Sequence, residues 1–197
     1  MARRAATTKT WFTINWWSAV KRSSLEAAEL VGVKEAVFLG YADGALTPSL
    51  ELRRDPTRLI RRLRPDRVPI MDPTQVLISG EGFDYINHPD HRATGEASLY
   101  AIFPSAETRP IFPELLDEGL EPHHVNEVYL MMSDKPNIAI DVTAVWDKKI
   151  QSLLAHRSQV GEDVADMIRQ VGRGDRKRGR RAAGRELPRD AFHQRHA

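Results

Sequence analysis

The chain has 197 residues, of which 41% are hydrophobic and 28% charged, enough for one α/β domain with a sizeable core. It contains no cysteine, which excludes a disulfide framework and a thiolate zinc site, so any metal must be held by histidine and carboxylate side chains. No apolar run approaches the roughly 20 residues needed to cross a bilayer. We therefore expect a cytoplasmic protein without a membrane span.

The net charge of +2 conceals a basic segment at each end of the sequence. Residues 1–22 hold five Lys or Arg and no acid, and residues 172–197 hold nine against three acids. The 149 residues between them carry 15 basic and 24 acidic side chains. Basic tails can bind the phosphates of nucleic acid, but a solvated, poorly ordered terminus is the commoner explanation, and we expect no nucleic-acid partner.

The first ordered pattern predicts a helix from Ser23 to Gly32. Ser23 and Glu26 fit a capping box, and Gly32 is a natural helix stop. The apolar run 36–39 predicts a short buried strand, which a turn at 40–44 would close.

A second helix is predicted to start at Asp55-Pro56, an N-cap followed by proline at the first helical position, and to end at Pro65. The later elements are predicted in this order: a strand at 68–71, a loop at 80–91, a helix of small residues through 93–97, an irregular excursion at 104–123, strands at 128–132 and 138–142, and a last long helix capped by Thr143. Beyond Gly172 no apolar period is present. Helices that alternate with short apolar strands predict the α/β class, with βαβ units and a mainly parallel sheet.

Residues 87–92, with the sequence NHPDHR, form the one dense cluster of potential functional groups. Pro89 suits the first position of a helix, which would place His91 in the first turn. The positive end of the helix dipole disfavours an imidazolium there, and neutral imidazole is the form that binds metal. His88 lies close enough to face the same cavity, and Asp90 could fix the tautomer of a neighbouring imidazole. A polar surface loop is the alternative.

Residues 88–97, HPDHRATGEA, resemble the HPDHRAxGEA signature of the PIG-L/LmbE-type de-N-acetylases, a family that includes N-acetylglucosaminyl-phosphatidylinositol and mycothiol-pathway deacetylases. Three weaker matches occur in the family's order: 25–44, similar to "EAA..LGV…FLGYPDG", 60–66, similar to "IRRxRPD", and 141–159, similar to "DVT…K…AHRSQ". The resemblance runs from about residue 24 to residue 162.

The resemblance implies a Rossmann-like three-layer fold and a zinc-dependent hydrolase that removes the acetyl group from an N-acetylated amino sugar or its conjugate. His91 matches a metal ligand of the family. His88 matches the general acid or oxyanion-stabilising residue, and Asp90 matches its orienting carboxylate. Zinc lowers the pKa of bound water and polarises an acetamide carbonyl, while a further carboxylate takes the proton of the water.

The family's other motif, AHPDDE, occurs nowhere in this sequence. In the family it supplies a His ligand, an Asp ligand and the general base at the end of the first strand. We hypothesise that residues 1–23 replace this strand, which leaves 24–171 as the family domain and 172–197 as a basic tail. Because a parallel sheet is buried on both faces, the loss of an inner strand predicts poor solubility or a homo-oligomer.

Other side chains could replace the missing ligands, although each has a commoner structural explanation: His123, His124, Asp84 and His156. Asp43 is first a turn residue and second a candidate for substrate contact. Three hypotheses for function follow. The chain is a family de-N-acetylase, a catalytically inactive homologue that serves as a binding or scaffold module, or a nucleic-acid-associated protein that acts through its basic ends.

Overall fold

The computed structural model describes residues 8–80, 83–177 and 182–186. These residues fall into two compact units, one drawn from Met1–Phe38 and Asp141–Ala182 and the other from Leu39–Ile140 and Ala183–Ala197. The division into 1–23, 24–171 and 172–197 stays a prediction. Among the described residues, no helix is both long enough and apolar enough to cross a bilayer.

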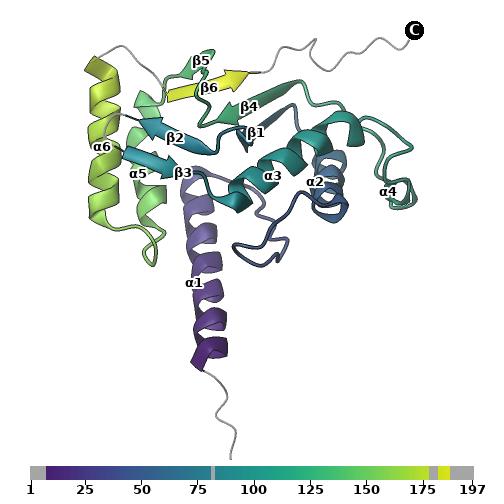
Figure 1. Ribbon diagram of the computed structural model, residues 1–197, viewed down its shortest axis with the longest axis horizontal. Coiled ribbons are helices and arrows are strands. Elements are labelled where there is room, and N and C mark those ends of the chain that lie inside the picture. The colour runs from purple at the N-terminus through teal and green to yellow at the C-terminus, as the bar shows by residue number, and fades with distance from the viewer. Residues whose placement is uncertain (1–7, 81–82, 178–181, 187–197) are drawn as a thin grey trace, which may run out of the picture. The chain divides into compact units, whose positions relative to one another are not determined.

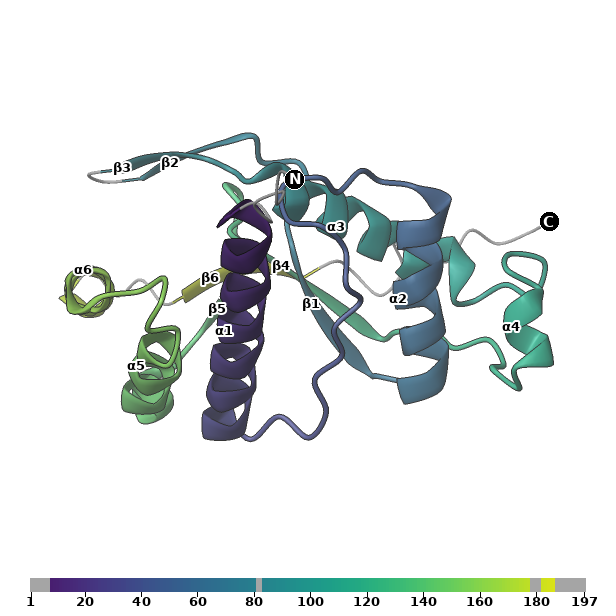
Figure 2. The ribbon, with the colours of Figure 1, turned by 90° about the horizontal axis from the view of Figure 1, so that it is seen from below.

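The first unit is helical (Figure 1). It contains α1 (Thr8–Val31), the short η2 (Thr143–Val145), α5 (Trp146–Leu154) and α6 (Glu162–Lys177). Helix α5 packs against both α1 and α6, and Figure 2 shows α1 and α5 side by side.

The predicted helix start at Ser23 is wrong, because Ser23 lies inside α1. Its Oγ donates to the carbonyl of Val20 at 2.9 Å, a bond that a serine makes within a helix. Residues 8–22 contain neither glycine nor proline, so nothing in them interrupts the helix.

The prediction of one last helix was also wrong, because the chain turns after α5 and α6 follows. Glu162 and Asp163 lie in the first turn of α6, where the helix dipole favours acids, and Ala165 is fully buried. Helix α6 continues past Gly172 to Lys177, where the sequence offered no basis for assigning an element.

The second unit holds a four-stranded sheet in the order β1-β4-β6-β5. The strands are β1 (Arg67–Met71), β4 (Glu127–Met131), β5 (Ile138–Ile140) and β6 (Ala182–Glu186). Strands β1 and β4 are parallel, with Val68 opposite Val128, and β6 runs antiparallel to β4. The α/β class predicted from the sequence is confirmed, and β6 adds an antiparallel strand that was not expected.

The outer edge of β1 carries a proline. The N–H of Asp72 donates to the carbonyl of Met131. In a parallel pair the backbone groups of every second residue point toward the partner strand, so those of Ile70 point toward β4. The backbone groups of Pro69 point the opposite way, to the outer edge of the sheet. Pro69 has no N–H to donate, which makes this edge a poor template for a further strand. The homo-oligomer and the poor solubility expected from the sequence stay predictions.

Helix α2 (Leu50–Leu63) starts earlier than predicted. Its N-cap is Ser49, whose Oγ accepts a hydrogen bond from the N–H of Leu52 at 3.1 Å, so Asp55-Pro56 lies inside the helix and does not begin it. The predicted strand at 36–39 is likewise absent, since no strand is assigned to these residues and Val37 is 44% exposed. A short apolar run forms a strand only where a neighbouring strand pairs with it.

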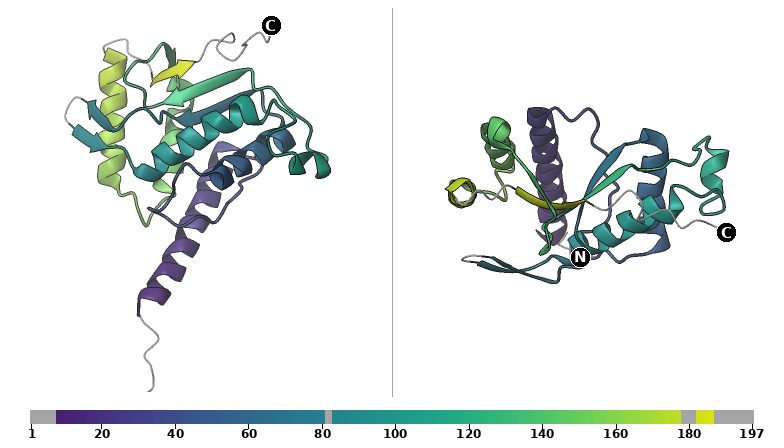
Figure 3. Two further views of the ribbon diagram at one scale, coloured as in Figure 1. Left: turned by 45° about the vertical axis from the view of Figure 1, so that its right-hand side comes forward. Right: turned by 90° about the horizontal axis from the view of Figure 1, so that it is seen from above.

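Helix α3 (Pro89–Tyr100) lies beside α2, as both views of Figure 3 show, and also packs against β1. The contact with β1 is close because Gly95 has no side chain. A Cβ built at Gly95 would lie 2.4 Å from the carbonyl oxygen of Met71. The end of β1 therefore fixes the position of α3.

The remaining elements of this unit are the hairpin β2 (Leu77–Gly80) and β3 (Phe83–Ile86), the turn η1 (Ala101–Ser105) and the short helix α4 (Glu114–Asp117). Its core consists of buried apolar side chains from α2, β1, η1, β4 and the segments beside them: Ile60, Ile70, Ala101, Ile102, Ala106, Val125, Val128 and Leu130.

Candidate active site at the start of helix α3

The first turn of α3 presents the residues that the sequence singled out. Pro89 occupies the first helical position, as predicted, and His88 is the N-cap. Nδ1 of His88 accepts a hydrogen bond from the N–H of Asp90 at 3.2 Å. His88 therefore caps the helix through its imidazole, and its direction is set by the helix start.

Asp90 forms hydrogen bonds that hold a turn, distant in the sequence, against the start of α3. Its buried carboxylate accepts hydrogen bonds from the N–H of Gly44 at 2.6 Å and from the N–H of Leu46 at 3.1 Å. Gly44 has a φ of +77°, which a residue with a side chain rarely adopts. The two bonds place Asp43, the residue before this glycine, next to the start of α3.

Packing on the helices supports the same turn. Leu46 and Tyr41 pack against the buried cluster of Leu52, Ala93 and Ala97, and the Tyr41 hydroxyl donates to Asp55 at 2.8 Å. Burial and the neighbouring carboxylate of Asp55 raise the pKa of Tyr41 to about 12, so this hydroxyl stays protonated as a donor at neutral pH.

Asp90→Asn is expected to loosen this turn. An amide oxygen is a weaker acceptor than a carboxylate, and hydrogen bonds to charged groups contribute about 1.5–3 kcal/mol. Hydrogen exchange at the amides of Gly44 and Leu46 should accelerate about 10-fold to 100-fold. Glu96→Gln, on the same helix, is the control and should leave both amides unchanged. Equal exchange in wild type and Asp90→Asn would contradict the role given to Asp90.

Three side chains at this point have the geometry of a metal group. One ligand-type atom from each of Asp43, His88 and Asp90 lies within 4.8 Å of the other two, and in the described part of the chain no other such group of three occurs. Ligands of one tetrahedral zinc lie about 3.4 Å apart, so a divalent ion fits after a contraction of about 1 Å. Each carboxylate oxygen of Asp90 keeps a second lone pair beside its bond to an N–H.

The hydrogen bonding of His88 distinguishes a ligand from a proton donor. A neutral imidazole whose Nδ1 accepts a hydrogen bond carries its proton on Nε2, and that nitrogen then donates. The N–H of Asp90 thus favours His88 as a donor. His91 is exposed, and its ring centroid lies 5.5 Å from that of His88, so a second imidazole stands beside the cluster.

Asn87 anchors this segment to the hairpin. Its N–H donates to the carbonyl of Val76 and its Nδ2 to the carbonyl of Gln75, each at 2.9 Å. The side chain is 3% exposed, and its Oδ1 has no hydrogen-bond partner among the described residues. The backbone just before His88 is therefore held on both sides, by the hairpin and by the helix.

Two of the substitute ligands considered from the sequence, His123 and His124, do not join this group. Nε2 of His123 lies 2.9 Å from the carbonyl oxygen of Pro65, and Nδ1 of His124 lies 2.7 Å from a carboxylate oxygen of Glu107. The two imidazoles therefore serve local contacts. Asp84 belongs to β3, and its side chain lies outside the described part of the structure.

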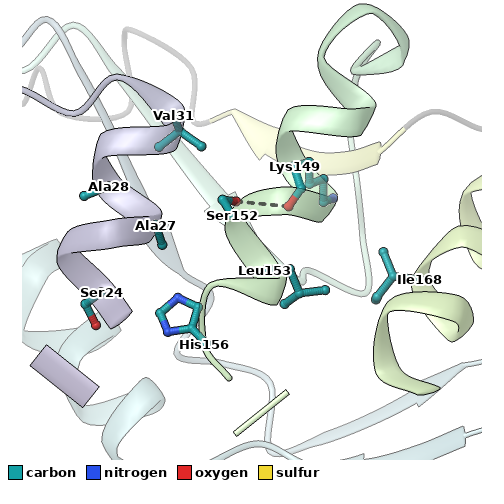
Figure 4. Close-up of a pocket in the computed structure, with 9 residues that line it drawn as sticks. All are labelled: Ser24, Ala27, Ala28, Val31, Lys149, Ser152, Leu153, His156 and Ile168. Atoms are coloured by element: carbon teal, nitrogen blue, oxygen red, sulfur yellow. Dashed lines mark hydrogen bonds between the residues drawn. The ribbon is translucent and has the colours of Figure 1, made fainter. Parts of the chain in front are cut away.

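His156 belongs to the helical unit, where it lines a cavity of about 530 Å³ (Figure 4). Its Nδ1 lies 3.3 Å from Oγ of Ser23. The Ser152 hydroxyl of α5 donates to the carbonyl of Lys149 at 3.0 Å. The cavity is lined by residues of α1, α5 and α6 and by His156, which follows the end of α5: Ser24, Ala27, Ala28, Val31, Lys149, Ser152, Leu153, His156 and Ile168.

The α/β fold thus presents a histidine and two aspartates together at a helix start, a candidate metal and acid–base group. Residues 9–102 match the family model described as "PIG-L: GlcNAc-PI de-N-acetylase". The predicted family is confirmed, and the chain belongs to the PIG-L/LmbE-type de-N-acetylases.

Individual relatives agree with this membership. The chain is 32% identical over 142 residues to the diacetylchitobiose deacetylase of Thermococcus kodakarensis, covering 72% of this chain and 49% of that protein. It is 30% identical over 161 residues to a Bacillus anthracis protein named "Probable N-acetyl-alpha-D-glucosaminyl L-malate deacetylase 2", covering 79% of this chain and 63% of that protein.

A solved structure shows the same fold. The N,N'-diacetylchitobiose deacetylase of Pyrococcus horikoshii aligns with a TM-score of 0.75 and 29% identity, over 90% of this chain and 66% of that one. This chain thus spans from about half to just under two thirds of the length of the relatives it matches.

Proposed function

We propose that this protein is a metal-dependent deacetylase that removes the acetyl group from an N-acetylated amino sugar or its conjugate. The observation that carries the proposal is the convergence of Asp43, His88 and Asp90 at the start of α3, within the segment that resembles the family's HPDHR signature. The substrate class is supported by two relatives, which are named as deacetylases of diacetylchitobiose and, as a probable activity, of N-acetyl-alpha-D-glucosaminyl L-malate.

Each residue of the site has a proposed role. His88, with its proton on Nε2, donates to the oxyanion or to the leaving amine. Asp90 holds the 43–46 turn and the helix start together. We propose that the ion is zinc, held by Asp43, by Asp90 and by His91, the ligand that the family resemblance implies and whose ring lies beside that of His88. When bound, zinc lowers the pKa of a bound water and polarises the acetamide carbonyl.

The absence of the AHPDDE string bears on the rate. In the family this string supplies the general base and two ligands, and among the described residues the group of three at the start of α3 is the candidate for those tasks. General acid–base catalysis contributes about 10²–10⁴-fold to a rate, so we expect slow acetate release by the chain of this sequence. Metal binding without acetate release from any N-acetylated amino sugar would instead support the catalytically inactive homologue.

A matched pair of variants tests the division of roles between the two histidines. His91→Ala should lose bound zinc, because it removes the one imidazole ligand. His88→Ala should keep zinc and lose acetate release by about 10²–10⁴-fold, because it removes only the proton donor. Zinc content by elemental analysis and acetate release from diacetylchitobiose are the two readouts.

The opposite pattern would contradict these roles. Zinc lost in His88→Ala and kept in His91→Ala would make His88 the ligand. If both variants keep zinc, the ion does not bind at this site.

Two further expectations from the sequence stay predictions. The cytoplasmic location is one. The other is that the basic tail binds no nucleic acid, and most of this tail, residues 178–181 and 187–197, lies outside the described residues.

A further inference from the structure

The β2–β3 hairpin exposes an apolar pair close to the site. Leu77 and Ile86 face each other across the two strands, and they are 68% and 73% exposed. Successive side chains of a strand alternate between its faces, so the neighbouring pair of Ile78 and Tyr85 lies on the opposite face. Figure 2 shows the hairpin running outward from the start of α3.

The side chains of Leu77 and Ile86 lie close together because of the position of the two residues in the strand pairing. The bond from the N–H of Asn87 to the carbonyl of Val76 makes these two residues a hydrogen-bonded pair. Leu77 and Ile86 form the next pair, which is not hydrogen-bonded. Side chains approach each other most closely in such pairs, so the two form one continuous apolar surface.

This surface is also fixed relative to the proposed proton donor. Ile86 precedes His88 by two residues, so their Cα atoms lie at most about 7 Å apart. Asn87, between them, is buried and bonded to both Gln75 and Val76. A ligand that places its acetamide at His88 could thus also contact Leu77 and Ile86.

The size of the surface indicates its occupant. A stable interface between two proteins buries about 800 Å² on each partner, far more than two aliphatic side chains can offer. Two aliphatic side chains do match a short hydrocarbon or aryl group on a small molecule. His88, the proposed proton donor, follows Ile86 by two residues and lies with Asp43 in the group where a sugar and its acetamide would bind.

We propose that Leu77 and Ile86 form an apolar platform that binds the non-sugar group of an N-acetylated amino sugar conjugate and selects an alkyl or aryl group there. This inference rests on the proposed function, and it makes the substrate more apolar than the second sugar or the malate in the relatives' names. The platform contacts the non-reacting part of the substrate, so its contribution can be measured as an affinity, without turnover.

Calorimetry with two glycosides tests the platform without requiring turnover. The zinc-loaded protein should bind hexyl N-acetylglucosaminide about tenfold more tightly than the methyl glycoside, as expected for burial of part of an alkyl chain. Leu77→Thr combined with Ile86→Thr should bring the two affinities together. Threonine keeps the strand preference of the replaced residues, and both sites are exposed, so the hairpin should persist. Tyr85→Thr, on the opposite face, is the matched control and should keep the tenfold ratio.

The outcomes separate the two proposals. If neither glycoside binds, both the proposed function and the platform fail. If both bind with equal affinity, or if the double variant keeps the tenfold ratio, the platform alone is overturned. If the double variant sediments with a lower molecular mass than the wild type, a second copy of the chain covers this face in the wild type. That result also overturns the platform.

Discussion

Arg61→Met is expected to lower the free energy of unfolding by about 3–5 kcal/mol, because several hydrogen bonds from a charged donor are lost and each contributes about 1.5–3 kcal/mol, partly offset by no longer burying the charge. Arg61 is 2% exposed, and its guanidinium donates to four backbone carbonyls, those of Ser105, Thr108, Ile111 and Leu120. Burial lowers the pKa of this guanidinium, which shows that its charge is poorly solvated. It is the carbonyl dipoles of the 105–120 segment that stabilise the charge.

Methionine would fill part of the same volume but could not donate a hydrogen bond. The four carbonyls would then lack their donor, and each unsatisfied buried group costs about 1–3 kcal/mol unless water reaches it. Urea unfolding followed by circular dichroism measures the change. Arg62→Met is the control, because Arg62 is exposed and a surface charge contributes up to about 1 kcal/mol. Equal losses in the two variants would show that the buried guanidinium has no special role.

Gly95→Ala is expected to lower the free energy of unfolding by about 1–3 kcal/mol, the usual cost of overpacking. The added Cβ would lie 2.4 Å from the carbonyl oxygen of Met71 and 3.3 Å from atoms of the Pro73 ring. The first contact is with backbone, so relief requires α3 to move away from β1. Alanine otherwise favours a helix over glycine by about 1 kcal/mol, so a loss of stability would come from the clash.

Thr94→Ala provides the comparison for Gly95→Ala, since Thr94 is exposed on the same helix and should change stability by less than about 0.5 kcal/mol. The same urea titration serves both variants. Because α3 carries His88 and His91, Gly95→Ala should also weaken zinc binding. A stability equal to or above that of wild type would mean that α3 does not rest on the end of β1.

Elements with strong local signals were predictable, and α3 is the best example. Proline at its first position and the polar residues before it define the helix start without help from the rest of the chain. The start of α2 was not predictable in this way, because both Ser49 and Asp55 fit an N-cap. Proline at position 56 favoured the wrong one, although a helix can hold a proline after its first turn at a cost.

The strand expected at 36–39 and the helix expected from Ser23 failed for a different reason. Each depended on a local pattern that tertiary context overrode. Ser23 has the right composition for a cap but sits in an uninterrupted helix, and Val37 has the right composition for a strand but no strand pairs with it among the described residues.

The site was predictable in part. His88, Asp90 and His91 are adjacent in the sequence, so a local motif was enough to find them. Asp43 is 47 residues away from Asp90, and the bonds that bring it near depend on the folded path of the 43–46 turn. The only sequence signal for Asp43 was its position in the 25–44 match, where it reads first as a turn residue.

Anomalous X-ray scattering at the zinc edge, from crystals grown with zinc, would locate the ion. We expect a peak at the start of α3, within coordination distance of His91 and of the carboxylates of Asp43 and Asp90, with His88 beside it but not bound. No peak at this helix start, or the main peak at His123 and His124, would contradict this expectation.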